Sequence, residues 1–335
     1  MTCQPSHKLQ QRGAALIVAM LVFALATTLI VAMGSEFTLF LKRGANSFIA
    51  QQGYAYLRGG EELAGLVLRQ DQETDKQAQQ QRDDLTELWA QQMPPYALDE
   101  GGWLVGSLED LQGRFNINSV AGTAPKGKRF TAAQEQFIRL LQTPDDPRVS
   151  EQDAVLITEA LMDWLDKDSE PRDFGAEDDY YFDMTPSYRA ANLNMHSVSE
   201  LRLVAYMTAE IYNALAPYLS VWGTNASINI HTAPLAVLRT INTAGDLRPL
   251  TIQEGETLFE MREESGFDSL QAMLDSPVFA GREIAPELQA RLGETSVWFL
   301  YRGEVEVAGR KARMYSVLRR DGIKVQALMR GSAEL

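Results

Sequence analysis

The chain is poor in the residues that make disulfides and most metal or nucleophile sites. Its 335 residues include one cysteine, Cys3, and three histidines, His7, His196 and His231. A single cysteine cannot form an intrachain disulfide, so burial and hydrogen bonding have to stabilise the fold. The G-x-S-x-G motif of serine hydrolases and the phosphate-binding P-loop are also absent from the sequence. We therefore expect that the protein is not an enzyme.

Positive charge is scarce as well. The 31 lysines and arginines face 45 aspartates and glutamates, which gives a net charge of -14 at pH 7. A strongly acidic surface repels the phosphates of nucleic acids and of anionic lipids, so neither is an expected partner. The length and the 45% hydrophobic content are ordinary for a globular chain of about two folded units.

A long apolar run lies near the start of the chain. Residues Ala14–Met33 carry no charge, and Lys8 and Arg12 precede them, with Gly13 at the boundary. Twenty helical residues span about 30 Å, the thickness of the bilayer hydrocarbon. The basic residues predict that this end stays in the cytoplasm and that the remaining chain lies on the other side of the membrane.

Three interpretations of this run compete. A secretory signal usually has a shorter apolar core and would be cut near Ala32-Met33-Gly34. A simple membrane anchor explains the length but not the sharp boundary after Arg12. Cleavage between Gly13 and Ala14 would remove the basic leader and keep the whole apolar helix, and this is the interpretation we favour.

The residues after the run predict a long helix and a small sheet. Apolar residues recur at helical spacing between residues 37 and 67, whereas residues 71–85 are polar and typical of a solvated linker or frayed helix. Residues 102–119 have the alternation of strands with a turn, and residues 296–330 predict three antiparallel strands. The simplest fold pairs the early and late strands against the N-terminal helix.

The chain between these strands, residues 120–290, is expected to be an inserted helical domain with five or more helices. Hydroxyl residues that match the S/T-x-x-E/Q capping box precede three of its apolar-periodic stretches. The pairs are Thr131 with Gln134, Ser197 with Glu200, and Thr251 with Glu254.

Two stretches of this region echo each other, residues 193–204 and residues 228–241. Both place an asparagine, an apolar residue, a histidine (His196 or His231) and a hydroxyl residue before a helix. The second stretch is similar to a helix-hairpin-helix unit of DNA-binding proteins, but its connection lacks the Gly-x-Gly pair that holds a phosphate. Helical packing with shared ancestry is the simpler explanation.

Residues 163–183 contain nine carboxylates, opposed only by Lys167 and Arg172. Such crowding raises carboxyl pKa values or pushes a segment apart, yet five aromatic residues in the same stretch indicate that it packs. A packed cluster of acids needs a cation, and oxygen ligands at irregular spacing favour calcium over zinc or copper. A solvated acidic loop and a glycosidase acid and base pair are the alternatives, the second with no visible sugar-binding groove.

The N-terminus resembles the type IV pilin-like leader of type II secretion pseudopilins, and the later sequence is similar to the large K-type minor pseudopilins. The resemblance implies that prepilin peptidase cuts between Gly13 and Ala14 and that Ala14 is N-methylated. It also implies two calcium ions in the inserted domain. The residues that we expect to hold them are Asp163, Asp166, Asp168, Glu177, Asp178 and Asp179.

Val18 occupies the fifth mature position, where most pilin-like subunits carry a glutamate. In the family, that carboxylate is thought to neutralise the amino terminus of the subunit above it. An unpaired carboxylate within the bilayer costs about 2.5–3.5 kcal/mol on insertion scales. Valine therefore suits a subunit with nothing above it, at the tip of the assembly, although it would also make a better simple anchor.

The resemblance predicts an α+β pseudopilin fold with a large inserted helical domain, anchored in the bacterial inner membrane with its head in the periplasm. Its expected parts are the leader 1–13, the helix 14–70, the first head segment 71–119, the insertion 120–290 and the last strands 291–335. The implied function is to prime the pseudopilus that exports folded proteins, with minor pseudopilins I and J, prepilin peptidase, the inner-membrane platform and exported cargo as partners. The alternative is a membrane-tethered periplasmic domain for nucleic acid uptake.

Overall fold

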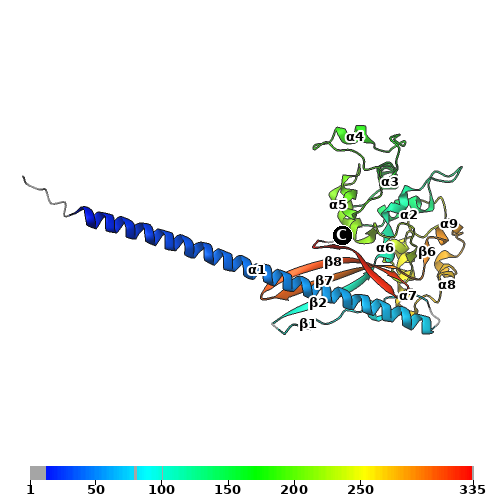
Figure 1. Ribbon diagram of the computed structural model, residues 1–335. Helices are drawn as coiled ribbons and strands as arrows, with labels where there is room; N and C mark the ends of the chain where they lie inside the picture. Colours follow the sequence, from blue (N-terminus) through cyan, green and yellow to red (C-terminus); the bar gives the residue numbers. More distant parts are fainter. Residues whose placement is uncertain (1–12, 79–80, 100, 334–335) are drawn as a thin grey trace, which may run out of the picture.

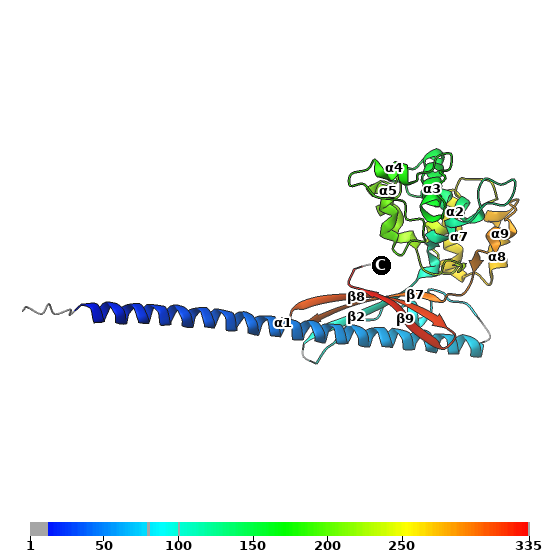
Figure 2. The ribbon, with the colours of Figure 1, turned by 45° about the horizontal axis from the view of Figure 1, so that its top comes forward.

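The protein was analysed as a computed structural model that describes residues 13–78, 81–99 and 101–333. One long helix, α1 (Ala14–Ala78), lies along one face of a five-stranded antiparallel sheet, and a mostly helical region stands above the other face (Figures 1 and 2). The N-terminal end of α1 projects far from both (Figure 1). The α+β architecture predicted from the sequence, a long N-terminal helix packed on a small antiparallel sheet with a mostly helical insertion, is confirmed.

Helix α1 has an uncovered N-terminal part and a packed C-terminal part. Its apolar window has a mean hydropathy of 2.7, and none of it is buried. From Gly53 onward one face of the helix is buried against the sheet. The helix continues to Ala78, into the stretch expected to be a solvated linker or frayed helix, and Asp71 in this part accepts a hydrogen bond from Arg320 of the sheet at 2.9 Å.

The sheet has the strand order β1-β2-β7-β8-β9, and every neighbouring pair is antiparallel. The three predicted C-terminal strands are confirmed, whereas residues 102–119 supply one long strand and a second of two residues. The strands are β1 (Tyr96–Ala97), β2 (Gly102–Asp110), β7 (Trp298–Val307), β8 (Arg310–Asp321) and β9 (Lys324–Gly331).

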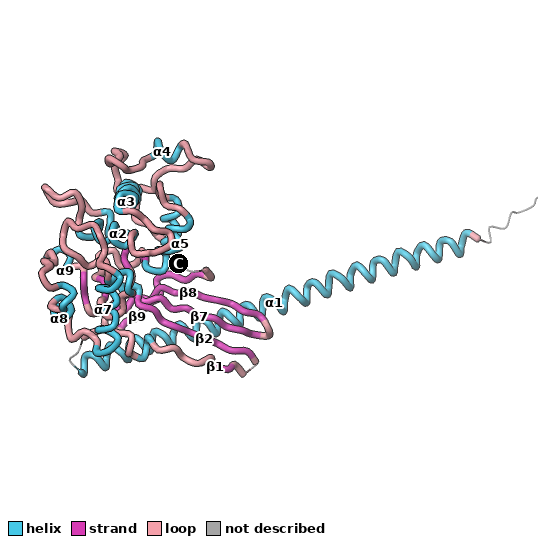
Figure 3. The backbone as a smooth tube through the Cα atoms, turned by 180° about the vertical axis from the view of Figure 1, so that it is seen from behind, coloured by secondary structure: helices cyan, strands magenta, loops and turns pink. Residues whose placement is uncertain are grey.

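The chain between β2 and β7 forms the inserted region. Its helices are α2 (Ala132–Leu141), α3 (Glu151–Leu165), α4 (Asp178–Phe182), α5 (Ala209–Leu215), α6 (Leu235–Leu238), α7 (Ile252–Ser265), α8 (Leu270–Leu274) and α9 (Pro286–Gln289), and Figure 3 shows how loops separate them. Two-residue parallel ladders pair β3 (Phe115–Asn116) with β4 (Leu219–Ser220) and β5 (Ile228–Asn229) with β6 (Leu292–Gly293).

Short 3-10 helices complete the described elements. They are η1 (Leu88–Ala90), η2 (Leu111–Gly113), η3 (Ile117–Ala121), η4 (Val198–Leu203), η5 (Ala216–Tyr218) and η6 (Pro277–Phe279). All three predicted capping boxes are present, at the starts of α2, η4 and α7. The local signals for helix starts were therefore correct, although the second box begins a 3-10 helix.

A buried polar junction joins the inserted region to the sheet. The side-chain amide of Asn229 donates to the carbonyl oxygen of Asp83 at 2.9 Å, to Asp110 at 3.1 Å and to Ser296 at 2.9 Å. Asp110 also accepts a hydrogen bond from Ser296 at 2.6 Å. All four residues are buried, so these bonds fix the orientation of the insertion on the sheet.

The packing of α1 on the sheet includes one buried charge. Glu61 is 3% exposed; Arg330 donates to it at 2.7 and 2.9 Å and Ser316 at 2.6 Å. Burial alone would raise the pKa of Glu61, but the bonds from Arg330 and Ser316 outweigh it and lower the pKa. At Gly60, one residue earlier, a Cβ would collide with the hydroxyl of Tyr301, so glycine permits this close approach.

We predict that Glu61→Gln destabilises the protein by about 2 kcal/mol, because it leaves the Arg330 guanidinium without a matching charge. Denaturant unfolding of the full chain in detergent measures the change. The control is Glu62→Gln, since the Glu62 side chain is 68% exposed and its ion pair with Arg58, at 3.5 Å, lies at the surface. A Glu61→Gln variant as stable as the control would contradict this assignment.

Candidate functional site

The acidic stretch 163–183 runs from the end of α3 to the end of α4, at the far edge of the inserted region (Figure 2). Aromatic packing holds it in place, as the sequence predicted. The ring of Tyr181 is fully buried and lies edge-on to Trp164, with ring centroids 5.2 Å apart. Its hydroxyl accepts a hydrogen bond from the backbone N–H of Ala205 at 3.2 Å.

Asp163 is compensated within the chain. Its side chain is fully buried, one oxygen accepts from the backbone N–H of Arg172 at 3.1 Å, and the other is paired with the Arg172 guanidinium. Burial raises the pKa of Asp163, and the bonds from Arg172 oppose that rise. A Cβ at position 175 would collide with the same carboxylate, which explains the glycine there. Asp163 thus holds the loop in shape.

Asp166, Asp168 and Glu177 converge on one point. Each residue contributes one carboxylate oxygen, and these three oxygens lie within 4.8 Å of one another. Glu177 is 6% exposed, and neither of its oxygens has a hydrogen-bond partner. Burial and the nearby charges of Asp163, Asp166 and Asp168 raise the pKa of Glu177 to about 7. Such a carboxylate lacks a positive partner.

Asn192 belongs to the same neighbourhood, although sequence reasoning missed it. Its amide donates to the carbonyl oxygen of Asp168 at 3.1 Å, while its side-chain oxygen is buried without a partner. One oxygen of Asp166 is also buried and unpaired. Asn192 has a φ of 49°, a left-handed backbone conformation that asparagine tolerates better than most residues. The sequence gives no signal for Asn192 as a candidate ligand, because its backbone conformation and its position beside Asp168 arise only in the folded chain.

Asp178 and Asp179 lie apart from this convergence. Asp178 accepts from the backbone N–H of Ala190 at 3.1 Å and lies 3.8 Å from Arg189, and Asp179 is exposed on α4. Of the six residues expected as metal ligands, the structure therefore brings Asp166, Asp168 and Glu177 together and leaves Asp178 and Asp179 at the start of a helix. Arg172 is paired with Asp163 and, at 2.5 Å, with one oxygen of Asp166, so only the other Asp166 oxygen is free for a metal.

The unpaired oxygens define what the site can do chemically. Asp166, Glu177 and Asn192 contribute buried oxygens without hydrogens to satisfy them, and Asp168 adds a further carboxylate. Nitrogen and sulfur ligands are absent from this group. An all-oxygen set with two or three carboxylates fits a hard divalent cation, which would also offset the charge that now raises the pKa of Glu177.

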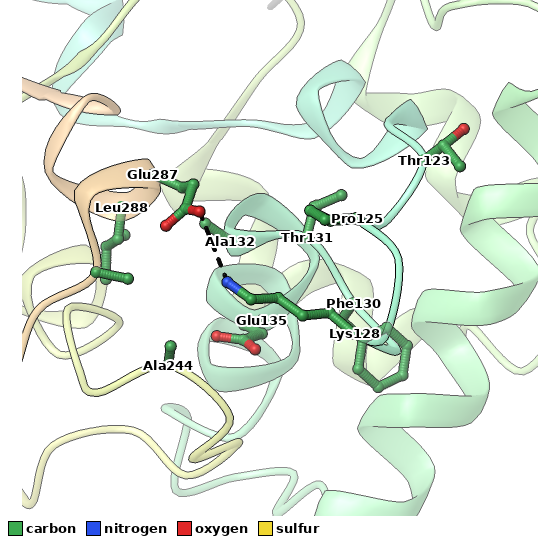
Figure 4. A pocket seen from close by; sticks show the side chains of 11 residues that line it. Thr123, Pro125, Lys128, Phe130, Thr131, Ala132, Glu135, Ala244, Glu287 and Leu288 are labelled. Carbon is green, nitrogen blue, oxygen red and sulfur yellow. Dashed lines mark ion pairs between the residues drawn. The ribbon is translucent and has the colours of Figure 1, made fainter.

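A small pocket and a second acidic group also lie in the described part of the chain. The pocket in Figure 4 has a volume of about 230 Å³ and an exposed pair, Lys128 Nζ to Glu287 Oε1, at 3.7 Å. Glu135 at its base is already bound by Arg139 at 3.1 Å. Asp71, Asp83 and Glu87 form a second acidic group, at the end of α1.

The connection between α6 and α7, which is similar to a helix-hairpin-helix turn, directs carbonyl oxygens toward the Arg139 side chain of α2. Arg139 donates to the carbonyl oxygens of Thr240, Thr243 and Asp246 at 3.0, 2.9 and 2.8 Å. The backbone N–H of Gly245 donates to Glu135 at 3.0 Å. A backbone engaged in this way does not offer a phosphate cradle, which weakens the DNA-binding alternative.

The two histidines of the echo have different environments. His231 is 2% exposed and its Nε2 lies 3.9 Å from a Glu294 oxygen, whereas His196 is exposed and its backbone N–H donates to Glu200 at 2.7 Å.

Gly13, at the expected processing point, lies in a turn just before α1, which begins at Ala14. Gly13 and Ala14 are both exposed, so no other part of the described chain covers the expected cleavage point.

Comparison with known proteins places the chain in one family. The family described as type II secretion system, protein K, matches residues 113–224. The type II secretion system protein K of Pseudomonas aeruginosa is 36% identical over 261 residues, covering 77% of this chain and 74% of that protein. The Aeromonas hydrophila protein K is 31% identical over 321 residues, which cover 92% of each chain.

A solved structure has the same fold. It is a chain in the crystal structure of the GspK-GspI-GspJ complex from the type II secretion system of enterotoxigenic Escherichia coli, with a TM-score of 0.73 and 24% identity. The likeness covers 88% of this chain and 100% of that chain. With the sequence relatives above, the conclusion is direct: the chain belongs to the type II secretion system protein K family, the K-type minor pseudopilins.

Proposed function

We propose that this minor pseudopilin sits at the tip of the type II secretion pseudopilus, primes its assembly and so supports export of folded proteins across the outer membrane. The observation that carries the proposal is helix α1. It runs without interruption from an uncovered apolar span into the packed head. Such a rod can be buried in the inner membrane first and among other helices later.

The part of α1 outside the membrane also has an uncovered apolar stripe. Phe37, Leu41, Phe48, Leu63 and Leu66 are each more than half exposed. At 100° per residue they lie on the side of α1 opposite the buried face that begins at Gly53. A soluble helix seldom exposes such a stripe unless a partner covers it.

A groove beside the stripe extends this apolar surface. It has a volume of about 450 Å³ and no charged lining residue, and Leu63, Leu88, Met93 and Tyr96 stand along it. We infer that the partners are the minor pseudopilins I and J, because a relative of the same fold was solved in a GspK-GspI-GspJ complex. Prepilin peptidase, the inner-membrane platform and exported cargo are the further partners that this function requires.

The shape of the head supports a position at the tip. The inserted region lies at the end of the molecule far from the apolar start of α1 (Figure 1). A second subunit stacked above would meet this wide body. Val18 agrees with that position, because a tip subunit has no neighbour above whose amino terminus a carboxylate at this position could neutralise.

We further propose that calcium is the cation held by Asp166, Asp168 and Glu177, with the Asn192 side-chain oxygen as an additional ligand. Calcium takes six to eight oxygen ligands in flexible geometry, which suits a site built from a loop. Bound calcium would fix the loop between α3 and α4. A second ion, near Asp178 and Asp179, stays a prediction.

For the leader, we predict a mature chain that begins at an N-methylated Ala14, because the peptidase removes the residues through Gly13 and leaves the apolar helix intact. Intact-mass and N-terminal peptide mass spectrometry of the membrane-extracted protein tests this. A chain that begins at Ser35, or one that keeps residues 1–13 while secretion proceeds, would contradict it.

For assembly, we predict that Phe48→Glu or Leu63→Glu weakens binding to the I and J pseudopilins at least about tenfold without changing the melting temperature. Losing one buried apolar anchor costs on the order of 1–3 kcal/mol at an interface. Titration calorimetry of the detergent-solubilised proteins measures the affinity. Ile323→Glu, at an equally exposed position in the β8–β9 turn, is the control. Equal affinities for all variants would count against the stripe.

For the metal, we predict that calcium raises the melting temperature by about 5 °C or more and that a chelator reverses the rise, since a ligand that binds only the folded state stabilises it. Glu177→Gln should abolish most of the shift. Asp173→Asn, at an exposed acid of the same loop, should keep it. A calcium-independent midpoint in the wild type would rule out this site.

A further inference from the structure

The second acidic group lies where α1, the sheet and the inserted region meet. Asp71 belongs to α1, and Asp83 and Glu87 belong to the connecting segment, residues 81–95, which joins α1 to β1. Oxygens of these three carboxylates lie within 4.8 Å of one another. Arg320 of β8 is the cation paired with them, through Asp71 at 2.9 Å and through Asp83.

One guanidinium cannot balance three carboxylates that are this close. Arg320 is 3% exposed and Asp83 is 1% exposed, so water screens their charges weakly. Glu87 has no basic partner among the described residues; its one bonded oxygen accepts from the indole N–H of Trp89 at 2.6 Å and from the backbone N–H of Asp84 at 3.2 Å. With all three ionised, these carboxylates carry two more charges than Arg320 balances, which favours the retention of a proton.

We propose that Asp71, Asp83 and Glu87 together retain one proton at neutral pH, and that this proton latches the connecting segment to the end of α1. Glu87 carries the proton. Burial, with the nearby charges of Asp71, Asp83 and Asp75, raises the pKa of Glu87 to about 8, although the Trp89 bond opposes the rise. Burial and the charge of Asp83 also raise the pKa of Asp71, to about 6.

Among the described residues, the charged groups around the latch come from five parts of the chain: α1, the connecting segment, β2, β8 and the inserted region. They are Asp71, Asp75, Arg82, Asp83, Asp84, Glu87, Asp110, His231, Glu294 and Arg320. Burial raises the pKa of Asp110 to about 6, and three side chains, those of Ser296, Thr232 and Asn229, donate hydrogen bonds to its carboxylate. Arg82 is paired with Asp84 at 2.9 Å, and burial lowers the pKa of His231, so neither supplies the missing charge to Glu87.

The latch has consequences for the whole junction. The backbone of Asp83 donates to Glu294 at 2.9 Å and accepts from Asn229, and its side chain accepts from the N–H of Ser296 at 2.6 Å. Trp89, bonded to Glu87, packs edge-on against Phe299 of the sheet at 5.2 Å. Loss of the proton therefore loosens the segment that ties α1 to both the sheet and the insertion.

The direction of the pH effect follows from the raised pKa of Glu87. The protonated group stabilises the closed segment fully below the ordinary glutamate pKa, and this stabilisation is lost as pH rises toward 8. With one proton involved, protection against opening falls by at most about tenfold per pH unit and levels off above about pH 8.

Hydrogen exchange of the full chain in detergent, corrected for the intrinsic pH dependence of exchange, tests the latch. We expect protection of peptides from residues 81–95 to fall roughly 10- to 100-fold between pH 6 and pH 8. Glu87→Gln should flatten this fall. Glu73→Gln, at an exposed acid on α1, should leave it unchanged.

Asp71→Asn provides an independent variant, because removing one neighbouring negative charge should move the levelling point to lower pH. A wild-type profile that is flat between pH 6 and pH 8 would overturn the proposal. A Glu87→Gln variant that keeps the wild-type slope would also overturn it. So would restoration of protection by calcium at pH 8.5, because the three carboxylates would then bind a metal ion in place of the proton.

Discussion

The apolar N-terminal part of α1 has to be buried, and no other part of the described chain covers it. The head covers the helix only from Gly53 onward, and only on one face. Twenty uncharged residues in water would be strongly unfavourable, so the helix requires first a bilayer and then neighbouring helices. The buried Glu61 bonds and the close contact at Gly60 attach the C-terminal part of this rod to the sheet.

A second constraint is the compensation of negative charge. The chain carries a net charge of -14, and it buries acids at two places with too few basic partners. Around Glu177 the unpaired oxygens face one another in a loop, an arrangement that a hard cation can satisfy. Around Glu87 an arginine is already paired with two of the carboxylates, and a retained proton reduces the remaining excess of negative charge. The same shortage of positive charge thus suits a bound cation around Glu177 and a retained proton around Glu87.

The sequence predicted the fold well, because helix periodicity, strand alternation and capping boxes are local signals. Less could be predicted of the candidate site. The carboxylate cluster was visible, but Asp163 pairs with Arg172 and Asn192 lies beside Asp168 only through tertiary folding. The helix α1 was also expected to be shorter, because the residues after position 70 are polar and the contact of Asp71 with Arg320, about 250 residues away in the chain, is not visible in the sequence.

The position of this subunit in the assembled pseudopilus tests the central claim most directly. A gold-binding tag in the exposed loop near Asp173 would mark the inserted region in isolated pseudopili viewed by electron microscopy. A subunit whose head blocks further stacking should give a single label at one end of each filament. Labels spaced along the shaft would contradict the tip assignment and the role given to the wide head.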